Sequence, residues 1–332
     1  MKRVGYLIEQ IADIDNMLLA YYKARRGKEG QQDVMDFSVA LDDNIDSLRA
    51  DILSGNILVG DYSYFMINDP KPRLICAAPF QQRVLHHAIM NVCHDRFEAH
   101  LIDTTYATRL GKGIYTAIER AKKASRKYPF VAKCDFRKYF DSIDHMILKQ
   151  KLSRLFKDKG LLRLFDKIID SYHSGIKGKG LPIGNLTSQY FANHYLSSLD
   201  HYCKEQLAVK EYVRYMDDFL VFAESREQLE IVIYKILKYS KDVLSLQLKT
   251  PILLEVNQGI PFCGYCIYPH KILLTSRSKH RFKHKIALYS HLLDNEQLDE
   301  KDYFNHVTPL LSFVEYAYTK QLRRVTLEYG NR

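Results

Sequence analysis

The fold is decided by one stretch of this sequence, Tyr212-Val213-Arg214-Tyr215-Met216-Asp217-Asp218-Phe219-Leu220-Val221-Phe222. The β-branched and aromatic residues on both sides of Met216-Asp217 predict two short strands, 212–215 and 219–222, joined by a tight turn. Asp is favoured in turns because of its local hydrogen bonds, so an isolated Asp-Asp pair predicts a turn and nothing more. The meaning of this pair therefore depends on acids elsewhere in the chain.

A third acid, Asp135, stands in a second apolar run, Phe130-Val131-Ala132-Lys133-Cys134-Asp135-Phe136. This run predicts a buried strand, and a helix is predicted near 145–155. The order strand, helix, helix, hairpin, helix predicts an antiparallel sheet backed by helices, in the α+β class. Since Asp135 ends its strand beside a turn, as Asp217 and Asp218 do, we expect the three carboxylates to meet at one edge of the sheet.

Carboxylates held within a few ångströms repel one another unless a proton or a divalent cation lies between them. Their oxygens are hard ligands that select Mg²⁺, which keeps coordination positions open for water and phosphate oxygens. Two such ions can clamp an in-line displacement at phosphorus, one at the attacking oxygen and one at the leaving pyrophosphate. The acids therefore predict two Mg²⁺ ions, with Mn²⁺ as a substitute, and nucleotidyl transfer.

The rest of the chain predicts a largely helical protein with two further β regions. Apolar residues at helical spacing cover 6–55, with one break at 25–28. The helix that carries Phe191 is expected to be capped by Thr187 or Ser188. The other expected elements are a hairpin over 62–77, a helix over 81–100, a helix after the capping box at 225–228, a β-rich region over 245–275 and a basic helical tail from 276.

The composition indicates a cytoplasmic protein with a polyanionic partner. The 332-residue chain carries a formal net charge of +10, and basic residues crowd two blocks, 120–127 and 277–285. Such blocks form either solvated faces or phosphate contacts. No stretch approaches the ~18 apolar residues of a membrane span, and the charged N-terminus is not a signal peptide. We therefore expect no membrane contact.

Six scattered cysteines fit a reducing compartment. Cys263 and Cys266 match the C-x-x-C pattern of some zinc sites. A hairpin explains the pair better, because structural zinc takes four N or S ligands and no second pair is present.

The motifs around the acids, taken in order, resemble those of reverse transcriptases over roughly residues 60–275. The matching segments are Lys71-Pro72-Arg73-Leu74-Ile75, Tyr106-Ala107-Thr108-Arg109-Leu110-Gly111-Lys112-Gly113, 135–145, 181–189, Tyr215-Met216-Asp217-Asp218, 246–249 and 262–265. The resemblance implies a right-hand polymerase with fingers, palm and a helical thumb. The implied division is an N-terminal helical extension over 1–60, fingers over 61–128 with part of 150–185, a palm over 129–250, a primer-grip hairpin over 251–275 and a thumb over 276–332.

The resemblance also implies roles for single residues. Asp135 and Asp217 resemble the metal-binding pair and Asp218 the third acid, while the carbonyl of Phe136 would add a metal ligand. Phe140 matches the bulky residue that excludes a nucleotide 2′-hydroxyl; it can also be a core residue, and the two roles are compatible. The other implied positions are Lys71, Arg73, Ile183, Gly184, Gln189 and Lys249 for the nucleotide, and Phe262, Cys263, Gly264 and Tyr265 for the primer grip.

One motif points to a class within the family. Ile183-Gly184-Asn185-Leu186-Thr187-Ser188-Gln189 has Ile where the commoner pattern has Gln, and Gln where it has Pro. Both departures resemble the reverse transcriptases of diversity-generating retroelements in bacteria and phages. This class implies error-prone copying of a template-repeat RNA into cDNA, chiefly at adenines, for mutagenic retrohoming. It also implies dNTPs, template RNA, an RNA–DNA duplex and a small accessory helical-bundle oligomer as partners.

Ile183 offers an aliphatic surface where a Gln would hydrogen-bond the incoming nucleotide, so we expect it to lower fidelity. Two alternatives stay open. The first is a reverse transcriptase of another bacterial class, such as a retron or phage-defence enzyme. The second is a nucleic-acid-binding relative without activity. The intact acids argue against the second.

Overall fold

The computed structural model describes residues 5–68 and 71–330. The N-terminal part of the chain is helical, as expected, but it is interrupted more than once, whereas a single break was predicted at 25–28. The carboxylate of Asp13 accepts hydrogen bonds from the backbone N–H groups of Asp15 and Asn16, which starts a new helix early. The resulting helices are α1 Ile8–Ile11, α2 Ile14–Arg25, α3 Gln32–Val39 and α4 Leu41–Ser54.

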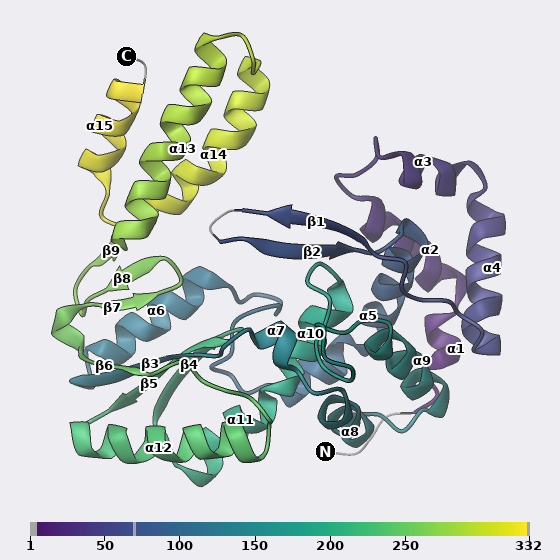
Figure 1. Cartoon of the computed structure of the whole chain (residues 1–332), viewed down its shortest axis with the longest axis horizontal. Helices are drawn as coiled ribbons and strands as arrows, with labels where there is room; N and C mark the ends of the chain where they lie inside the picture. The colour runs from purple at the N-terminus through teal and green to yellow at the C-terminus, as the bar shows by residue number, and fades with distance from the viewer. Residues whose placement is uncertain (1–4, 69–70, 331–332) are drawn as a thin grey trace.

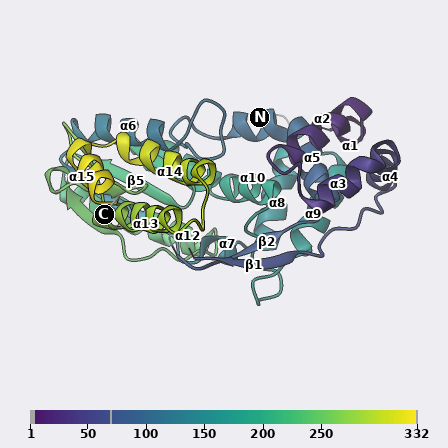
Figure 2. The same ribbon diagram turned by 90° about the horizontal axis from the view of Figure 1, so that it is seen from above.

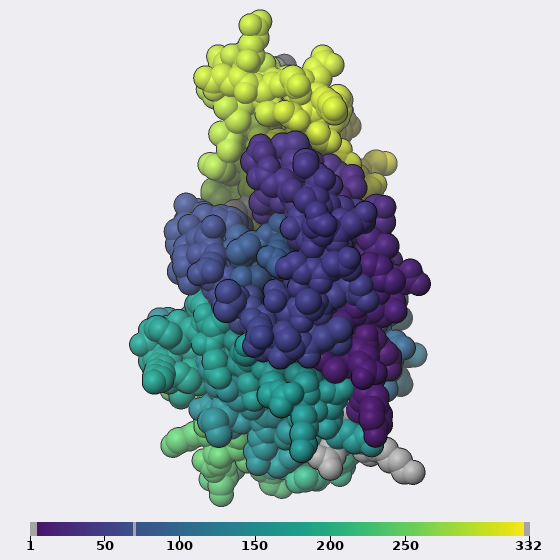
Figure 3. All heavy atoms as spheres, turned by 90° about the vertical axis from the view of Figure 1, so that its right-hand side faces the viewer, coloured from purple at the N-terminus to yellow at the C-terminus, as the bar shows by residue number. Residues whose placement is uncertain are grey.

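A two-stranded hairpin and a long helix follow, and both predictions are confirmed. β1 (Ser63–Ile67) pairs antiparallel with β2 (Arg73–Ala77), and α5 spans Phe80–His100. α2 packs along α5, so the N-terminal helices cover one flank of the molecule. Figure 3 shows this flank, with the N-terminal residues (purple) below the C-terminal helices (yellow) and above mid-chain residues (teal).

A four-stranded antiparallel sheet stands at the centre of the other half, in the order β4-β5-β3-β6 (Figure 1). Its strands are β3 Phe130–Asp135, β4 Glu211–Tyr215, β5 Asp218–Ala223 and β6 Ile252–Glu255. The predicted strand over 130–136 and the predicted hairpin are therefore confirmed. Met216 and Asp217 form the two-residue connection of that hairpin.

Both faces of the sheet are covered, because successive side chains of a strand point to opposite faces. Ala132, Cys134 and Phe219 belong to one core, together with side chains of α5 and of the helices between residues 145 and 242. Val131 and Leu220 belong to a second core on the opposite face, with side chains of the helix over 114–125 and of the C-terminal part. The sheet is therefore a rigid layer between two hydrophobic cores.

The helices around the sheet are α6 Ile114–Ser125, α7 Tyr139–Ser142, α8 His145–Leu155, α9 Lys159–Asp170, α10 Leu186–Tyr195, α11 Ser197–His201 and α12 Arg226–Asp242. The predicted cap at Ser225 is confirmed, since its hydroxyl accepts from the Gln228 N–H. The predicted cap of α10 is wrong. Asn185 holds the N-cap position, and Thr187 and Ser188 lie buried inside the first turn.

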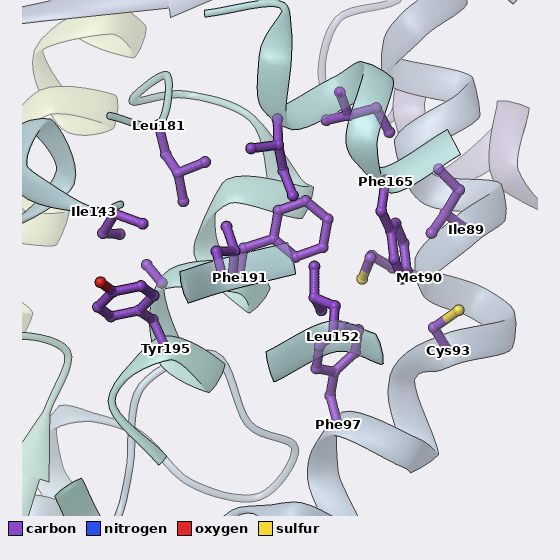
Figure 4. Close-up of a cluster of buried hydrophobic side chains, with 14 of the residues drawn as sticks. Ile89, Met90, Cys93, Phe97, Ile143, Leu152, Phe165, Leu181, Phe191 and Tyr195 are labelled. Carbon is purple, nitrogen blue, oxygen red and sulfur yellow. The ribbon is translucent and has the colours of Figure 1, made fainter. Parts of the chain in front are cut away.

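Part of the first core lies between α5, α9 and α10 (Figure 4). The rings of Phe165 in α9 and Phe191 in α10 meet with centroids 5.1 Å apart. Phe97 of α5 also lies against Phe191, with centroids 6.4 Å apart. Aromatic burial of this kind fixes α10, and with it the loop before α10, relative to the sheet.

The C-terminal part begins with a three-stranded sheet, β7 Ile260–Phe262, β8 Tyr265–Ile267 and β9 Ile272–Leu274. It ends in the helices α13 Ser276–Asp294, α14 Glu300–Glu315 and α15 Lys320–Gly330, which stand above the central sheet in Figure 1 and over it in Figure 2. The β-rich region over 245–275 and the helical tail are thus confirmed. None of the described helices is long and apolar enough to cross a membrane.

Candidate active site

The antiparallel register brings the three predicted acids to one edge of the central sheet. Asp135 ends β3, Asp218 begins β5, and the two residues are direct cross-strand partners. Such partners point to the same face, with Cβ atoms about 4.5–5.5 Å apart. Asp217 adjoins Asp218 in the turn between β4 and β5.

A fully buried arginine lies beneath this turn. Met216 has a φ of 53°, a left-handed conformation that costs a non-glycine residue free energy. Arg214 Nη1 donates to the Met216 carbonyl at 2.9 Å, and its Nε donates to Asp200 Oδ1 at 2.7 Å. Asp200 and Arg214 are both 0% exposed, and the Tyr212 hydroxyl also donates to Asp200 Oδ1. A buried ion pair therefore holds the backbone of the turn.

Two lysines lie against the acids. Lys249 N–H donates to the Asp135 carbonyl at 2.8 Å, and its ammonium forms an ion pair with the Asp135 carboxylate. The register of the segment beside β3 thus places Lys249 at the site. Lys133 Nζ lies 3.5 Å from Asp218 Oδ2. Lys133 shares the face of Asp135, because the two residues are two positions apart on one strand, with Cys134 between them.

Burial dominates the electrostatics of the acids. The pKa of Asp218 is raised to about 7, chiefly by desolvation; the charge of Lys133 opposes this rise, and the charges of Asp135 and Asp217 add to it. Desolvation also raises the pKa of Asp217, an effect that Asp135 reinforces and that Lys249 and Arg73 oppose. A cation at this edge would favour the charged forms of both carboxyl groups.

The donor set fits a divalent cation. Asp218 Oδ1 is buried and has no hydrogen-bond partner in the described part of the chain. Carboxylate oxygens are the ligands that Mg²⁺ prefers. Among residues 5–68 and 71–330, no group of three or more His, Cys, Asp or Glu side chains is already assembled for a metal ion. Lysine ammonium groups neutralise Asp135 and Asp218 in this arrangement.

The expected nucleotide loop joins the hairpin of β1 and β2. Cys76 N–H in β2 donates to the Ile183 carbonyl at 2.8 Å. Gly184 has a φ of 130°, and a Cβ added there would lie 2.7 Å from the Cys76 carbonyl oxygen. Only glycine permits this close approach of two backbones. Leu181 N–H donates to the Phe140 carbonyl, so the same loop also holds α7, where Phe140 is half-buried.

The remaining predicted nucleotide-binding residues are less closely tied to the acids. Lys71 and Arg73 are exposed on the hairpin, and the charge of Arg73 reaches Asp217. Gln189 is exposed on α10. Phe136 follows Asp135 with its ring buried at 1% exposure, so only its backbone can face the acids.

The turn between β7 and β8 links the acids to the C-terminal helices. Asp217 and Asp218 both act on the thiol of Cys263, whose pKa is raised chiefly by burial. The Gly264 carbonyl accepts from the Ser278 hydroxyl at 2.7 Å, and the Tyr265 hydroxyl donates to the Phe313 carbonyl at 2.6 Å. Phe262 is fully buried. The predicted primer-grip residues therefore anchor α13 and α14 beside the acids.

Sequence reasoning missed Lys133, Arg214 and Asp200. Arg214 carried a signal, since a charge in an apolar strand next to Tyr215 needs a buried partner. That partner, Asp200, lies in helix α11 and could not be identified from spacing. Lys133 could have been found from its two-residue separation from Asp135.

A comparison with protein families decides the identity. The sequence model of the reverse transcriptase (RNA-dependent DNA polymerase) family matches residues 68–251, which is more than half of the chain and contains all three acids. The chain belongs to the reverse transcriptase family. This family comprises RNA-directed DNA polymerases, which are nucleotidyltransferases.

Individual relatives of this reverse transcriptase are distant. The putative COX1/OXI3 intron 1 protein of Saccharomyces cerevisiae is 22% identical over 60% of the chain, and the match spans 25% of the yeast protein. Protein YkfC of Escherichia coli is 23% identical over 66% of the chain and 69% of its own length. An apo telomerase structure from Candida tropicalis aligns with a TM-score of 0.52 at 12% identity, over 86% of this chain and 64% of that one. The right-hand polymerase fold is thereby confirmed.

Proposed function

We propose that this chain is an RNA-directed DNA polymerase that extends a primer along an RNA template by nucleotidyl transfer. The observation that carries the proposal is the direct pairing of Asp135 with Asp218 across two strands, with Asp217 in the adjoining turn. Membership of the reverse transcriptase family supports this chemistry over other phosphoryl transfers.

Asp135, Asp217, Asp218 and the Phe136 carbonyl are the groups that would hold two Mg²⁺ ions, or Mn²⁺ in their place. Bound ions of this kind activate the attacking hydroxyl and stabilise the charge on the leaving pyrophosphate. For the carboxylates to bind, Asp218 must lose its proton, because burial raises its pKa to about 7. The ammonium of Lys249 must leave Asp135, and in our proposal it then protonates the pyrophosphate.

The substrate nucleotide is proposed to lie between the hairpin and the loop before α10. Lys71 and Arg73 would bind its triphosphate through charge-assisted hydrogen bonds. Gly184 permits close backbone approach, and the half-buried ring of Phe140 would exclude a 2′-hydroxyl.

The test is Mg²⁺-dependent dNTP incorporation on a primed RNA template by the wild type and by Asp217→Asn. We expect the variant to lose the activity, because one metal ligand is removed at the centre. Asp242→Asn, which changes an exposed acid of α12, is the matched control and should retain it. Activity that persists in Asp217→Asn would exclude the metal assignment.

We also propose that the enzyme belongs to the diversity-generating class and copies a template-repeat RNA with errors at adenines for mutagenic retrohoming. Ile183 supports this proposal, since its branched aliphatic side chain stands where the commoner motif of the family that the sequence resembles has Gln. A polar contact that strengthens only in a correctly paired transition state adds selectivity, and ~1.4 kcal/mol is a factor of ten. Its absence would flatten discrimination between nucleotides.

Ile183→Gln and Ile183→Asn should therefore reduce misincorporation opposite adenine, measured by sequencing the cDNA. Ile231→Gln, which changes an exposed isoleucine of α12, is the control and should keep the wild-type errors. An unchanged error spectrum in both Ile183 variants would favour another bacterial class of reverse transcriptase.

The division into extension, fingers, palm, primer grip and thumb stays a prediction, as does a cytoplasmic location. The proposed partners are template RNA, the RNA–DNA duplex, dNTPs and a small accessory helical-bundle oligomer.

The basic blocks 120–127 and 277–285 are proposed to contact phosphate groups of the bound nucleic acid. Template binding should then weaken steeply with salt, because counterion release dominates such affinity.

A further inference from the structure

Lys133 is a charged residue in the mainly apolar strand β3, and its side chain is 22% exposed. It shares one face of the strand with Val131 and Asp135, because side chains alternate along a strand. A half-buried ammonium has lost part of its hydration, which costs free energy unless an anion lies beside it. The position of Lys133 therefore requires an anionic partner at this edge of the sheet.

Lys133 stands midway between the hairpin of β7 and β8 and the catalytic acids. Val131 belongs to the core that also holds Phe262 and Tyr265 of this hairpin, and β7 lies against β3. Asp135 lies four positions further along the same face, about 13 Å from Val131. Lys133 is the residue between them on that face, so its ammonium can serve a ligand that reaches from the hairpin to the acids.

The ion pair between Lys133 and Asp218 is long. The distance from Lys133 Nζ to Asp218 Oδ2 is 3.5 Å, whereas a charge-assisted hydrogen bond measures ~2.7–2.9 Å. In the proposed function Asp218 is also a metal ligand, so its negative charge would be shared with a cation. Lys133 then needs a second anion, and the anions that the proposed reaction brings to this edge are the candidates.

The cations around the acids lie on two sides. Desolvation raises the pKa of Asp217, and the charges of Lys249 and Arg73 oppose this rise. Burial also raises the pKa of Asp218, to about 7, and there the opposing charge is that of Lys133. Lys249 and Arg73 are thus on the side of the proposed triphosphate site, and Lys133 is on the other side.

The side of Lys133 is that of the turn between β7 and β8. Burial and the charge of Asp218 raise the pKa of the Cys263 thiol in this turn, and the charge of Lys133 opposes the rise. The turn is fixed in place, because the Gly264 carbonyl accepts from the Ser278 hydroxyl and from the Thr275 N–H. A nucleic-acid strand that passes from this turn to the acids therefore runs over Lys133.

In the proposed reaction the 3′-hydroxyl of the primer must meet the acids, and the last phosphodiester of the primer lies one nucleotide behind it. Phosphate contacts fix the register of a nucleic-acid strand without reading its sequence. We propose that Lys133 binds this last phosphodiester and so positions the 3′-hydroxyl at the acids. The flexible four-carbon stem of a lysine lets the ammonium turn from Asp218 to the phosphate. The inference rests on the proposed polymerase function and adds a primer-binding residue to it.

The test measures dissociation constants of the full chain for primed RNA templates by fluorescence anisotropy, with Mg²⁺ but without dNTP, so that no extension occurs. One primer is unmodified, and a second carries an uncharged methylphosphonate in place of its last phosphodiester. We expect the wild type to bind the unmodified primer roughly tenfold more tightly, because the second primer lacks a hydrogen bond to a charged group. Lys133→Met should bind both primers with the same, weaker affinity, and Lys133→Arg should keep most of the difference.

Lys210→Met is the matched control and should keep the full difference. Lys210 precedes β4 at the end of the sheet away from the acids, and its side chain is 69% exposed. A methylphosphonate placed well upstream of the primer end should affect the wild type and Lys133→Met equally. The slope of log Kd against log salt should fall by about 1 in Lys133→Met, as for the loss of one phosphate contact. Lys133→Gln tests the same contact with a polar side chain if the apolar one disturbs the fold.

A role confined to Asp218 predicts a different result. If Lys133 only stabilised this carboxylate, Lys133→Met would lower kcat and still prefer the charged linkage as the wild type does, and the proposal would be overturned. Equal affinity of the wild type for both primers would overturn it too. Primer extension by the wild type separates these outcomes from failure of the polymerase function, because an enzyme that extends primers without the preference lacks only this contact.

Discussion

Asp200→Asn is the substitution that most directly tests how the catalytic turn is held. It replaces one carboxylate oxygen of a fully buried ion pair with an amide that cannot carry the negative charge. Arg214 Nε and Nη2 donate to Asp200 at 2.7 and 2.5 Å, and neither side chain is exposed. The variant leaves the guanidinium charged and without its counter-ion in a low-dielectric core.

Removal of one partner of a buried ion pair costs about 3–5 kcal/mol. We expect this loss in the free energy of unfolding of Asp200→Asn, measured by urea denaturation. Glu224→Gln is the matched control, because the Lys210–Glu224 pair is 69% and 64% exposed and such pairs contribute about 0–1 kcal/mol. A loss below about 1 kcal/mol in Asp200→Asn would contradict the buried-pair argument.

The double variant Asp200→Leu/Arg214→Met separates stability from catalysis. An apolar pair should recover part of the lost stability, because it leaves no unpaired charge, while the Tyr212 hydroxyl and the Asn193 side chain lose their partners. The Met216 carbonyl then still lacks its donor, and a misplacement of ~1 Å at a reacting centre can lower a rate about 10²-fold. We expect kcat to stay low with little change in KM for dNTP, since Arg214 does not touch substrate. A double variant with the wild-type kcat would refute the positioning role.

Three further outcomes follow from the site. Asp218→Asn should stabilise the protein when a chelator removes metal ions, because burial raises the pKa of Asp218 to about 7. The wild type then loses stability as the pH rises from about 4 to 7, while the variant, which has no carboxyl group to ionise, does not. The variant's gain in unfolding free energy, at most about 4 kcal/mol, should vanish below this pH window. Gly184→Ala should lower the free energy of unfolding by about 1–3 kcal/mol and loosen the contact between the loop and the hairpin. Gly111→Ala is the control, because Gly111 has a φ of 68° and open space around it, so the added methyl group brings only backbone strain. Equal losses of stability on thermal unfolding of the two variants would contradict the contact with Cys76. Phe140→Ala should raise ribonucleotide incorporation at least ~10-fold relative to dNTP, and unchanged selectivity would leave Phe140 as a core residue only.

Much of the fold was predictable because its signals are local. The apolar run of β3 and the hairpin around Met216 carry the periodicity of strands, and the cap at Ser225 marks the start of α12. The start of α10 was not predictable in this way. Thr187 and Ser188 are good caps in isolation, but Asn185 takes the position because the preceding loop is held by Ile183 and Leu181.

The candidate site, too, could be predicted from the sequence only in part. The acids were identifiable from their places at strand ends, and the register then aligned Asp135 with Asp218. The position of Lys249 was uncertain from spacing alone, because it depends on the backbone pairing of its segment with β3.

The sequence by itself determined the chemistry: three carboxylates at strand ends, in an ordered set of motifs, indicate nucleotidyl transfer because acids that meet at one edge repel one another unless a proton or a divalent cation lies between them. The tertiary structure alone decided how those acids are held and what surrounds them. Burial raises the pKa of Asp218, and Arg214 in β4 can lie under the turn because Asp200 in α11 offsets its charge. Desolvation and charge pairing depend on distances between elements, which no local pattern encodes.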